Sequence, residues 1–327
     1  MRVLIFTEGG RQRGLGHISR CSSLYDEIEE RGMDVEFIIN GDLDHYQIIK
    51  DKRYKVVNWL SEDYLTTYIK KSDYCIVDSY LANEALCQLI SHSAKKALFI
   101  DDNGRINYPE GIVVNPSLSK EAVTYPKKAT SCYLVGPEYI ILRSSFKQVK
   151  REYINPSLKN VMITLGGSDI HNLTPLILEH LVQEHPTIVF HVIIGTGFGK
   201  NGEINKYLSK NVILYHQASA EEMKAIMVKS DLAITAAGQT IYELLATQTP
   251  FIPIKVVENQ NNNIAGLKEY KLIETVLEYD DLDFLGNLKK EVNNLSTVNM
   301  RSKLVSRYEN VVDGLGNRRI IDKMISS

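Results

Sequence analysis

The turn Gly14-Leu15-Gly16-His17 contains the residues best suited to do chemistry in this chain. It follows the apolar run 3–6 and precedes a helix-like stretch at 18–31. A strand that leads through a glycine turn into a helix gathers backbone N–H groups around one crevice, which suits a phosphate, and His17 adds an imidazole at the mouth. The third glycine of the dinucleotide fingerprint and the Walker lysine are missing, so neither nicotinamide nor nucleoside-triphosphate binding is predicted. The alternative is a tight turn with a helix-capping histidine.

A second glycine turn, Gly166-Gly167-Ser168-Asp169, follows an expected strand and precedes a helix that begins near Asn172. Its glycines permit close backbone approach and a positive φ, while Ser168 and Asp169 can cap the helix. Gly167 and Ser168 are therefore candidate phosphate contacts, expected on the opposite wall of a ligand cleft from the turn 14–17. An ordinary capped turn is the alternative.

Small residues at the end of another expected strand form the third candidate, Ala236-Ala237-Gly238-Gln239-Thr240. They let the backbone and a helix N-terminus approach a pyrophosphate. Glu243, one turn later, is unsuited to a phosphate, but its carboxylate can accept hydrogen bonds from both hydroxyls of a ribose. Gly238, Gln239, Thr240 and Glu243 are thus predicted to contact a nucleotide. The alternative for Glu243 is a solvated glutamate favoured by the helix dipole.

An amide-rich run at 258–263 begins with Glu258, Asn259 and Gln260. Side-chain amides donate and accept hydrogen bonds, which suits the hydroxyl or acetamido groups of a sugar. Asn259 and Gln260 are therefore candidate substrate contacts. A turn that begins a helix explains the same residues equally well.

Polar residues also follow two expected strands in the first half, Asp78-Ser79-Tyr80 and Asp101-Asp102. The carboxyl ends of parallel strands form the ligand-binding edge of an open sheet, so these residues are expected in the cleft. Two adjacent carboxylates with no further ligands specify no metal, and a loop role explains Asp101 and Asp102 as well as a functional one does. Arg143 could contact a phosphate or pair with a carboxylate.

Short apolar runs alternate with amphipathic stretches along the chain, the pattern of parallel sheets covered by helices. The sequence predicts an α/β fold with two Rossmann-like domains, over 1–145 and 155–327, whose sheets face each other across a cleft. The periodicity fades between Pro116 and Pro156, which we expect to cross between the domains, and the C-terminal helices can pack back on the first domain. The expected strands are 3–6, 35–39, 55–57, 74–77, 97–100, 112–114, 161–165, 188–193, 212–214, 232–235 and 251–253; the expected helices are 18–31, 63–70, 83–93, 174–184, 220–229 and 239–246.

Composition and charge narrow the class of protein. Apolar residues make up 44% and charged residues 24% of 327 residues, as in ordinary globular proteins. The net charge of −2 gives no electrostatic footprint for nucleic acid. The four cysteines form no CxxC pair, so reduced, mostly buried thiols are expected. No leader pattern and no apolar run approaching roughly 18 residues is present, so we expect a cytoplasmic protein without stable membrane insertion. No pattern assigns an oligomeric state.

The motifs GLGHISRC, IVDSY, FIDD, NPS, ITLGGSD and AITAAGQTIYELLATQTP with ENQ occur in that order. Together they resemble the UDP-sugar hydrolases of pseudaminic acid biosynthesis over nearly the whole chain, and DGLGNRR at 313–319 is similar to the end of that family. These hydrolases share the GT-B architecture with spore-coat polysaccharide proteins and with the N-acetylglucosaminyltransferase of peptidoglycan synthesis. The resemblance implies a GT-B fold and hydrolysis of a UDP-linked 2,4-diacetamido-2,4,6-trideoxy sugar, with no metal and no cofactor.

At the matching positions, the resemblance makes His17 the general base, puts Gly16 beside the phosphates and puts Tyr80 at the edge of the active site. It assigns Gly238, Gln239 and Glu243 to UDP, and Asn259 and Gln260 to the sugar or diphosphate. Asp78-Ser79-Tyr80-Leu81 stands where the hydrolases have DHYG, so a histidine and a glycine are missing on the sugar side. This departure bears on the substrate and on the choice between hydrolysis and transfer.

These expectations combine into an inverting hydrolysis. Backbone N–H groups stabilise the departing UDP, and His17, with an ordinary pKa of about 6.5, accepts a proton from the attacking water. The main alternative is a GT-B glycosyltransferase that uses a UDP-sugar donor in surface or spore-coat polysaccharide synthesis. A non-hydrolysing epimerase would need further acid/base residues, which Asp101 and Asp102 could supply. A UDP-sugar-binding protein without turnover is the third alternative.

Overall fold

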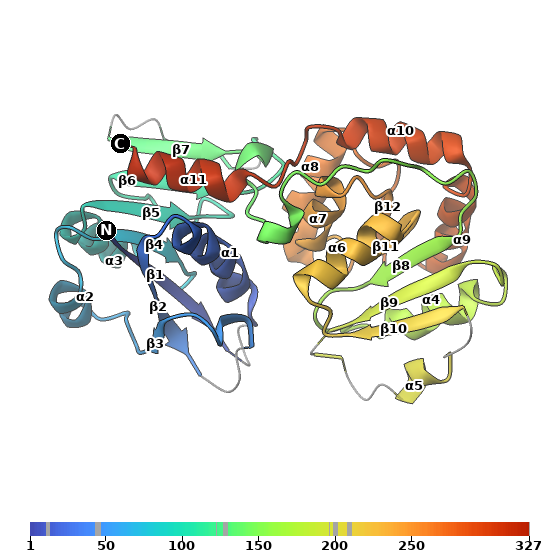
Figure 1. The fold of residues 1–327 in the computed structure, drawn as a ribbon, viewed down its shortest axis with the longest axis horizontal. Coiled ribbons are helices and arrows are strands. Elements are labelled where there is room, and N and C mark those ends of the chain that lie inside the picture. Colours follow the sequence, from blue (N-terminus) through green and yellow to red (C-terminus); the bar gives the residue numbers. More distant parts are fainter. Residues whose placement is uncertain are drawn as a thin grey trace. The chain divides into compact units, whose positions relative to one another are not determined.

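The computed structural model describes residues 1–10, 14–42, 47–121, 123–126, 130–195, 197–198, 202–207 and 211–326. The chain divides into two compact units. The first contains 1–144 together with 314–327, and the second contains 145–313. Residues 145–154 therefore lie in the second unit, and the end of the chain returns to the first (Figure 1).

The first unit is built on a parallel sheet with the strand order β3-β2-β1-β4-β5-β6-β7. The order reverses between β1 and β4, so the carboxyl ends of these two strands form the switch point at which open α/β sheets bind ligands. The strands are β1 (Arg2–Gly9), β2 (Asp34–Gly41), β3 (Tyr54–Val56), β4 (Tyr74–Asp78), β5 (Lys96–Ile100), β6 (Gly111–Asn115) and β7 (Ser131–Val135). The helices are α1 (Gly16–Glu30), α2 (Glu62–Tyr68), α3 (Glu84–Ser93) and α11 (Gly316–Ile325), with short 3₁₀ turns at Gln47–Ile49 and Pro137–Tyr139.

Both faces of this sheet are covered, which explains why its central strands β1, β4 and β5 are mainly apolar and buried. Val3 and Ile5 point to the face that packs against α1 and α11. Leu4 and Phe6, the alternate residues of the same strand, pack with side chains of α2 and α3. Burial of such aliphatic or aromatic side chains contributes about 1.5–3 kcal/mol each, so the two layers hold β1 firmly in the centre of the sheet.

The last helix, α11, is part of the first unit's core (Figure 1). Its Ile320, Ile321 and Met324 are fully buried in the cluster that contains the apolar face of α1. Asn317, also buried, donates to the carbonyls of Ser23 (3.0 Å) and Leu142 (2.8 Å) and accepts from the Leu142 N–H (3.2 Å). The end of the chain thereby fixes the position of α1.

The second unit repeats the plan, with the parallel strand order β10-β9-β8-β11-β12-β13. Its switch point lies between β8 and β11. The strands are β8 (Asn160–Thr164), β9 (Val189–Ile194), β10 (Val212–His216), β11 (Leu232–Ala236), β12 (Phe251–Lys255) and β13 (Leu277–Glu278). The helices are α4 (Leu173–Leu181), α5 (Gly202–Asn205), α6 (Ala220–Lys229), α7 (Thr240–Ala246), α8 (Asn261–Glu269), α9 (Phe284–Asn294) and α10 (Val298–Tyr308), with 3₁₀ turns at Ser144–Phe146 and Glu258–Gln260.

The predicted α/β fold with two parallel sheets is confirmed, and each predicted strand overlaps an observed one. The segment 116–156, which we expected to cross between the domains, contains one strand that the sequence did not predict, β7, which pairs with β6 in the first sheet. This strand is only partly buried, so its sequence SCYLV lacks the long apolar run that marks the central strands. The two-residue β13 was likewise too short to give a pattern.

The cysteines are free thiols, with Cys21, Cys75 and Cys87 buried and Cys132 partly buried, as predicted. Within the described residues, no helix combines the length and apolar character that crossing a membrane requires.

Candidate active site

The turn between β1 and α1 presents bare backbone at the switch point of the first sheet. Gly10 and Gly14 exchange two backbone hydrogen bonds of 3.1 and 2.8 Å, and Gly14 has a φ of +73°. Among the described residues, and leaving aside chain neighbours and the backbone of α1 itself, no atom lies within 4 Å of where a Cβ on Gly14 or Gly16 would be. Residues 11–13 lie outside the described residues. No side chain of the described residues therefore fills the space next to these two glycines.

His17 is the second residue of α1 and faces the end of β4. Its Nδ1 lies 2.8 Å from Oδ1 of Asp78, a fully buried carboxylate. A carboxylate accepts but does not donate, so Nδ1 carries the proton and Nε2 is the basic nitrogen of the neutral ring. In the described part of the chain, no protein group bonds Nε2. This geometry leaves a base directed by a carboxylate and available to a ligand.

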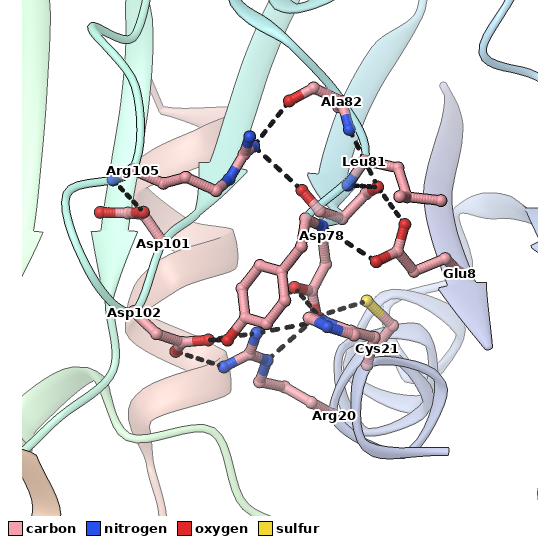
Figure 2. A network of polar contacts seen from close by, with 12 residues as sticks. Glu8, Arg20, Cys21, Asp78, Leu81, Ala82, Asp101, Asp102 and Arg105 are labelled. Carbon is pink, nitrogen blue, oxygen red and sulfur yellow. Dashed lines mark hydrogen bonds and ion pairs between the residues drawn. The ribbon is translucent and has the colours of Figure 1, made fainter. Parts of the chain in front are cut away.

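Arg20 lies one helical turn after His17 and joins two carboxylates (Figure 2). Its Nε and Nη2 donate to the two oxygens of Asp78 at 3.0 and 2.7 Å. Its Nη1 and Nη2 donate to the two oxygens of Asp102 at 2.6 and 3.1 Å. Two bidentate pairs of this kind fix the guanidinium plane and both carboxylates.

Tyr80 completes the group through its ring and its hydroxyl. The hydroxyl donates to Oδ2 of Asp102 at 2.7 Å. The ring meets that of His17 edge to face, with centroids 4.6 Å apart. Since about half of Tyr80 is exposed, it borders the space in front of His17. Tyr80 and His17 thus form one surface supported by Asp78, Arg20 and Asp102.

Glu8 and Ser79 shape the turn that carries Tyr80. The Ser79 hydroxyl donates to Glu8 and accepts from the N–H groups of Leu81 (3.0 Å) and Ala82 (3.2 Å). The other oxygen of Glu8 accepts from the Tyr80 N–H at 3.0 Å. Ser79, which stands in place of the histidine expected from the resemblance, therefore has a buried structural role.

Burial and charge shift the pKa values of this group in different directions. Burial disfavours protonated His17, but the hydrogen bond and charge of Asp78 outweigh it and raise the pKa of His17. Burial disfavours ionised Asp78, yet Arg20 and His17 hold the pKa of Asp78 far below its usual range, and Arg20 also lowers the pKa of Asp102. Burial and Asp102 raise the pKa of Tyr80, which keeps its hydroxyl a donor. His17 is therefore a stronger base than a free imidazole.

Asp101 and Asp102 have different roles. Asp101 is buried and accepts from the Gly104 N–H (2.7 Å) and from the hydroxyls of Tyr108 (3.0 Å) and Tyr125, so it organises its own loop. Asp102 instead belongs to the group around Arg20. Within the described residues, no cluster of three or more His, Cys, Asp or Glu side chains is placed to hold a metal ion.

Three loops lie together at one edge of the second sheet, because they follow the neighbouring strands β8, β11 and β12. In the first loop, Gly166, Gly167 and Ser168 are exposed, and apart from chain neighbours no described residue has an atom within 4 Å of where a Cβ on either glycine would be. Asp169 accepts from the N–H groups of Leu173 (2.9 Å) and Thr174 (2.7 Å), which is the capping role named as the alternative. The glycines, not the aspartate, are left to meet a ligand.

The second and third loops meet around Gly238. Oε1 of buried Gln260 accepts from the Val256 N–H at 2.9 Å, and its Nε2 lies 3.9 Å from where a Cβ on Gly238 would be. Asn263 donates to the Ala237 carbonyl at 2.9 Å and accepts from the Tyr242 hydroxyl at 2.6 Å. Glu243 is nearly buried in the first turn of α7, while Gln239 and Asn259 are exposed.

The predicted site residues fall into two groups, one in each unit. The structure brings Gly14, Gly16, His17 and Tyr80 together at the first switch point. It brings Gly167, Ser168, Gly238, Gln239, Thr240, Glu243, Asn259 and Gln260 to three adjacent loops of the second sheet. Arg143 is half-buried at the end of the first unit, next to Leu142.

Sequence reasoning missed several residues of these groups. Arg20 could have been found from the sequence, because it lies three residues after His17 in the expected helix, and residues with this spacing lie on the same helix face. Glu8 and Asn263 carried none, since their partners lie on other elements. His171 bonds the Val256 carbonyl at 2.9 Å and stacks on Tyr279, contacts that also depend on the tertiary fold.

Comparison with known proteins relates the chain to sugar-nucleotide proteins. Residues 160–313 match the glycosyltransferase family 28 C-terminal domain. An uncharacterised protein of Methanocaldococcus jannaschii is 30% identical over 77% of this chain and 55% of its own length. The spore coat polysaccharide biosynthesis protein SpsG of Bacillus subtilis is 25% identical over 80% of this chain and 79% of its own.

A bifunctional Helicobacter pylori protein is also similar to this chain. It is named pseudaminic acid cytidylyltransferase and UDP-2,4-diacetamido-2,4,6-trideoxy-beta-L-altropyranose hydrolase, and is 26% identical over 80% of this chain and 45% of its own length. The chain thus spans about half the length of this relative and of the archaeal one.

Solved structures share the fold at low identity. Acinetobacter baumannii MurG has a TM-score of 0.67 at 13% identity, covering 100% of this chain and 99% of its own. The pneumococcal O-GlcNAc transferase GtfA, solved with UDP and GlcNAc, has a TM-score of 0.60 at 8% identity, covering 100% of this chain and 99% of its own. A putative UDP-N-acetylglucosamine 2-epimerase of Listeria monocytogenes has a TM-score of 0.61 at 12% identity, covering 100% of this chain and 98% of its own. With the two parallel-sheet units described above, these likenesses identify the fold of this chain as GT-B.

Proposed function

We propose that this protein hydrolyses a UDP-linked 2,4-diacetamido-2,4,6-trideoxy sugar to the free sugar and UDP, with inversion at the anomeric carbon. The observation that carries the proposal is the hydrogen bond between His17 Nδ1 and Asp78, which leaves Nε2 as an available base beside an open glycine turn. This reaction belongs to nonulosonic acid biosynthesis of the pseudaminic type.

In the proposed step, a water oxygen attacks the anomeric carbon and its proton passes to Nε2 of His17. The bond between that carbon and the diphosphate oxygen breaks, and UDP leaves with the electron pair. Attack from the side opposite UDP inverts the anomeric centre. A positioned general base accelerates such a step by roughly 10²- to 10⁴-fold. The raised pKa of His17 makes it a better proton acceptor while Asp78 stabilises the imidazolium that forms.

The second unit would supply the UDP contacts. The backbone at exposed Gly167 and at half-buried Gly238 suits a diphosphate, because neither glycine has a side chain of its own to keep a ligand away. Ser168, Gln239 and Thr240 would add donors at the same strand ends, and Glu243 would accept from ribose hydroxyls. Asn259 and Gln260 would contact the diphosphate or the sugar. Gln260 fits this role through Nε2, since its Oε1 already accepts from Val256.

The similarity to the Helicobacter pylori hydrolase supports the choice of reaction and sugar. The fold alone does not identify the reaction, since proteins named as a transferase and as a putative epimerase share it. Arg20 lies between Asp78 and Asp102 and pairs with both carboxylates.

The test is to incubate the protein with a panel of UDP-acetamido sugars, without an acceptor, and to follow UDP release by NMR. Release that is lost in His17→Ala and kept in His92→Ala supports hydrolysis, because His92 is a surface histidine of α3 in the same unit. Turnover that requires an added acceptor would identify a glycosyltransferase and overturn the hydrolase proposal. Unchanged UDP binding with no turnover of any sugar would identify a binding protein.

A further inference from the structure

We propose that Arg20 is a positioning residue that holds Asp78 against His17 and keeps the imidazole in the unprotonated form that can act as a base. This inference rests on the proposed role of His17. The guanidinium of Arg20 is committed to the carboxylates of Asp78 and Asp102, so we assign it a role through Asp78 and not on the substrate.

The first step of the argument is a shared acceptor. Oδ1 of Asp78 accepts from Nδ1 of His17 at 2.8 Å and from Nη2 of Arg20 at 2.7 Å. Both donors therefore crowd one oxygen, and the two nitrogens are 3.5 Å apart. A protonated His17 would be a second cation beside the guanidinium, which disfavours the protonated state.

The second step is the charge that surrounds His17. The charged or titratable groups facing it from the described elements are Glu8 on β1, Arg20 on α1, Asp78 at the end of β4, Tyr80 after β4 and Asp102 after β5. Glu8 is committed to Ser79 and the Tyr80 N–H. Asp78, Asp102 and Arg20 together carry one net negative charge. Without Arg20 the two carboxylates would have His17 as their nearest compensating cation.

The third step is the shape of the arginine side chain. Four hydrogen bonds run from three nitrogens of one planar group to four carboxylate oxygens. A lysine ammonium keeps the charge but cannot span both carboxylates in this plane. Charge and orientation are therefore separable by substitution at this one residue.

The experiment is an NMR titration of the His17 imidazole in the full-length protein, with the signal assigned from its loss in His17→Gln. In Arg20→Gln we expect the pKa of His17 to rise by about one pH unit or more, the size that a charge within about 4–6 Å produces. In Asp102→Asn we expect a fall, because Arg20 then faces one carboxylate. The double variant Arg20→Gln/Asp102→Asn restores one net negative charge, and its pKa should return close to that of the wild type.

Turnover gives a second, independent readout. In Arg20→Gln the acidic limb of the kcat/KM profile should move to higher pH with the imidazole titration, so that activity recovers in alkaline buffer. Arg20→Lys should leave the limb in place and lower kcat at every pH. The matched control is Arg31→Gln, since Arg31 also pairs with two carboxylates, Glu27 and Asp322, at the opposite end of α1. It should leave both readouts unchanged.

An unchanged or lowered His17 pKa in Arg20→Gln would overturn the inference, as would single variants that shift it in the same direction. If Arg20→Gln does not fold, the Asp102→Asn variant decides instead. An unchanged or raised pKa of His17 in that variant would also overturn the inference. Because the titration needs no substrate, it decides the role of Arg20 even if no UDP-sugar is hydrolysed. The proposed function and this inference can therefore fail separately.

Discussion

Asp78 determines which nitrogen of His17 is basic, so a substitution of Asp78 should directly affect catalysis by His17. In Asp78→Asn the amide oxygen can still accept from Nδ1, but the charge that stabilises the imidazolium is lost. We expect kcat/KM for UDP release to fall by about 10²-fold or more, within the range of general-base contributions. The control is Asp73→Asn, because Asp73 pairs with Arg2 just before the opposite end of β4. A similar loss of turnover in both variants would contradict a specific role for Asp78.

The raised pKa of His17 also predicts how stability depends on pH. A group whose pKa is higher in the folded state stabilises the fold fully below its unfolded pKa, here about 6.5, and loses this contribution as the pH rises through the folded value. The wild type should therefore exceed His17→Gln in Tm by more at pH 6 than at pH 9. Thermal melts of both proteins at the two pH values measure this. A difference that grows toward pH 9 is incompatible with the ion pair between His17 and Asp78.

At the scale of elements, α1 carries the base at its start and a structural glycine after its end. Gly16 begins the helix, and a Cβ there would contact none of the described residues beyond its own helix and chain neighbours. Gly16→Ala should therefore leave Tm unchanged or slightly raised, while KM for the UDP-sugar increases. Gly32 follows the helix with a φ of +71°, so Gly32→Ala should cost about 1 kcal/mol of stability and leave KM unchanged. Kinetics and denaturant unfolding of the two variants test this pair. A reversed pattern would show that Gly16 serves the fold and not the ligand.

The elements themselves were largely predictable, because periodicity in the sequence reflects burial. Strand β1 is recognisable from Val3 to Phe6, since each of these side chains is fully buried on one face or the other. Strand β7 is not, because its outer position leaves it partly exposed and its residues mixed in character. Helix α11 could be predicted as a helix, but its membership of the first unit depends on contacts made across nearly the whole chain, such as Asn317 with Ser23.

For the whole molecule, the return of the chain end to the first unit has a measurable consequence. Asn317→Ala would leave the Ser23 carbonyl and both backbone groups of Leu142 without their partner, at a cost of about 1–3 kcal/mol. Trp59, the one tryptophan of the sequence, is buried in this unit, so its fluorescence reports the unfolding midpoint in denaturant. An exposed asparagine of the second unit, Asn293, gives the control variant Asn293→Ala. Equal midpoints for all three proteins would mean that α11 contributes little to the first unit.

The sequence could predict which residues gather at each strand edge, but not how they pair. The glycine turns and His17 stand next to strands, so the sheet topology alone brings them to the switch points. The group around Arg20 is different, because Asp78 lies 61 residues after His17 and Asp102 lies 82 residues after Arg20. Their pairing depends on side-chain directions at adjacent strand ends, which periodicity does not encode. Only the structure therefore shows the balance of charges around His17 that determines its basicity.

The central claim, that water attacks the anomeric carbon of a UDP-sugar, can be tested with labelled oxygen. The wild-type protein is incubated with a UDP-linked 2,4-diacetamido-2,4,6-trideoxy sugar in ¹⁸O-enriched water without an acceptor, and the masses of the products are measured by mass spectrometry. We predict that the released sugar carries one ¹⁸O atom at its anomeric carbon and that UDP carries none. Label in the diphosphate of UDP, or release of UDP only when an acceptor is added, would contradict the claim.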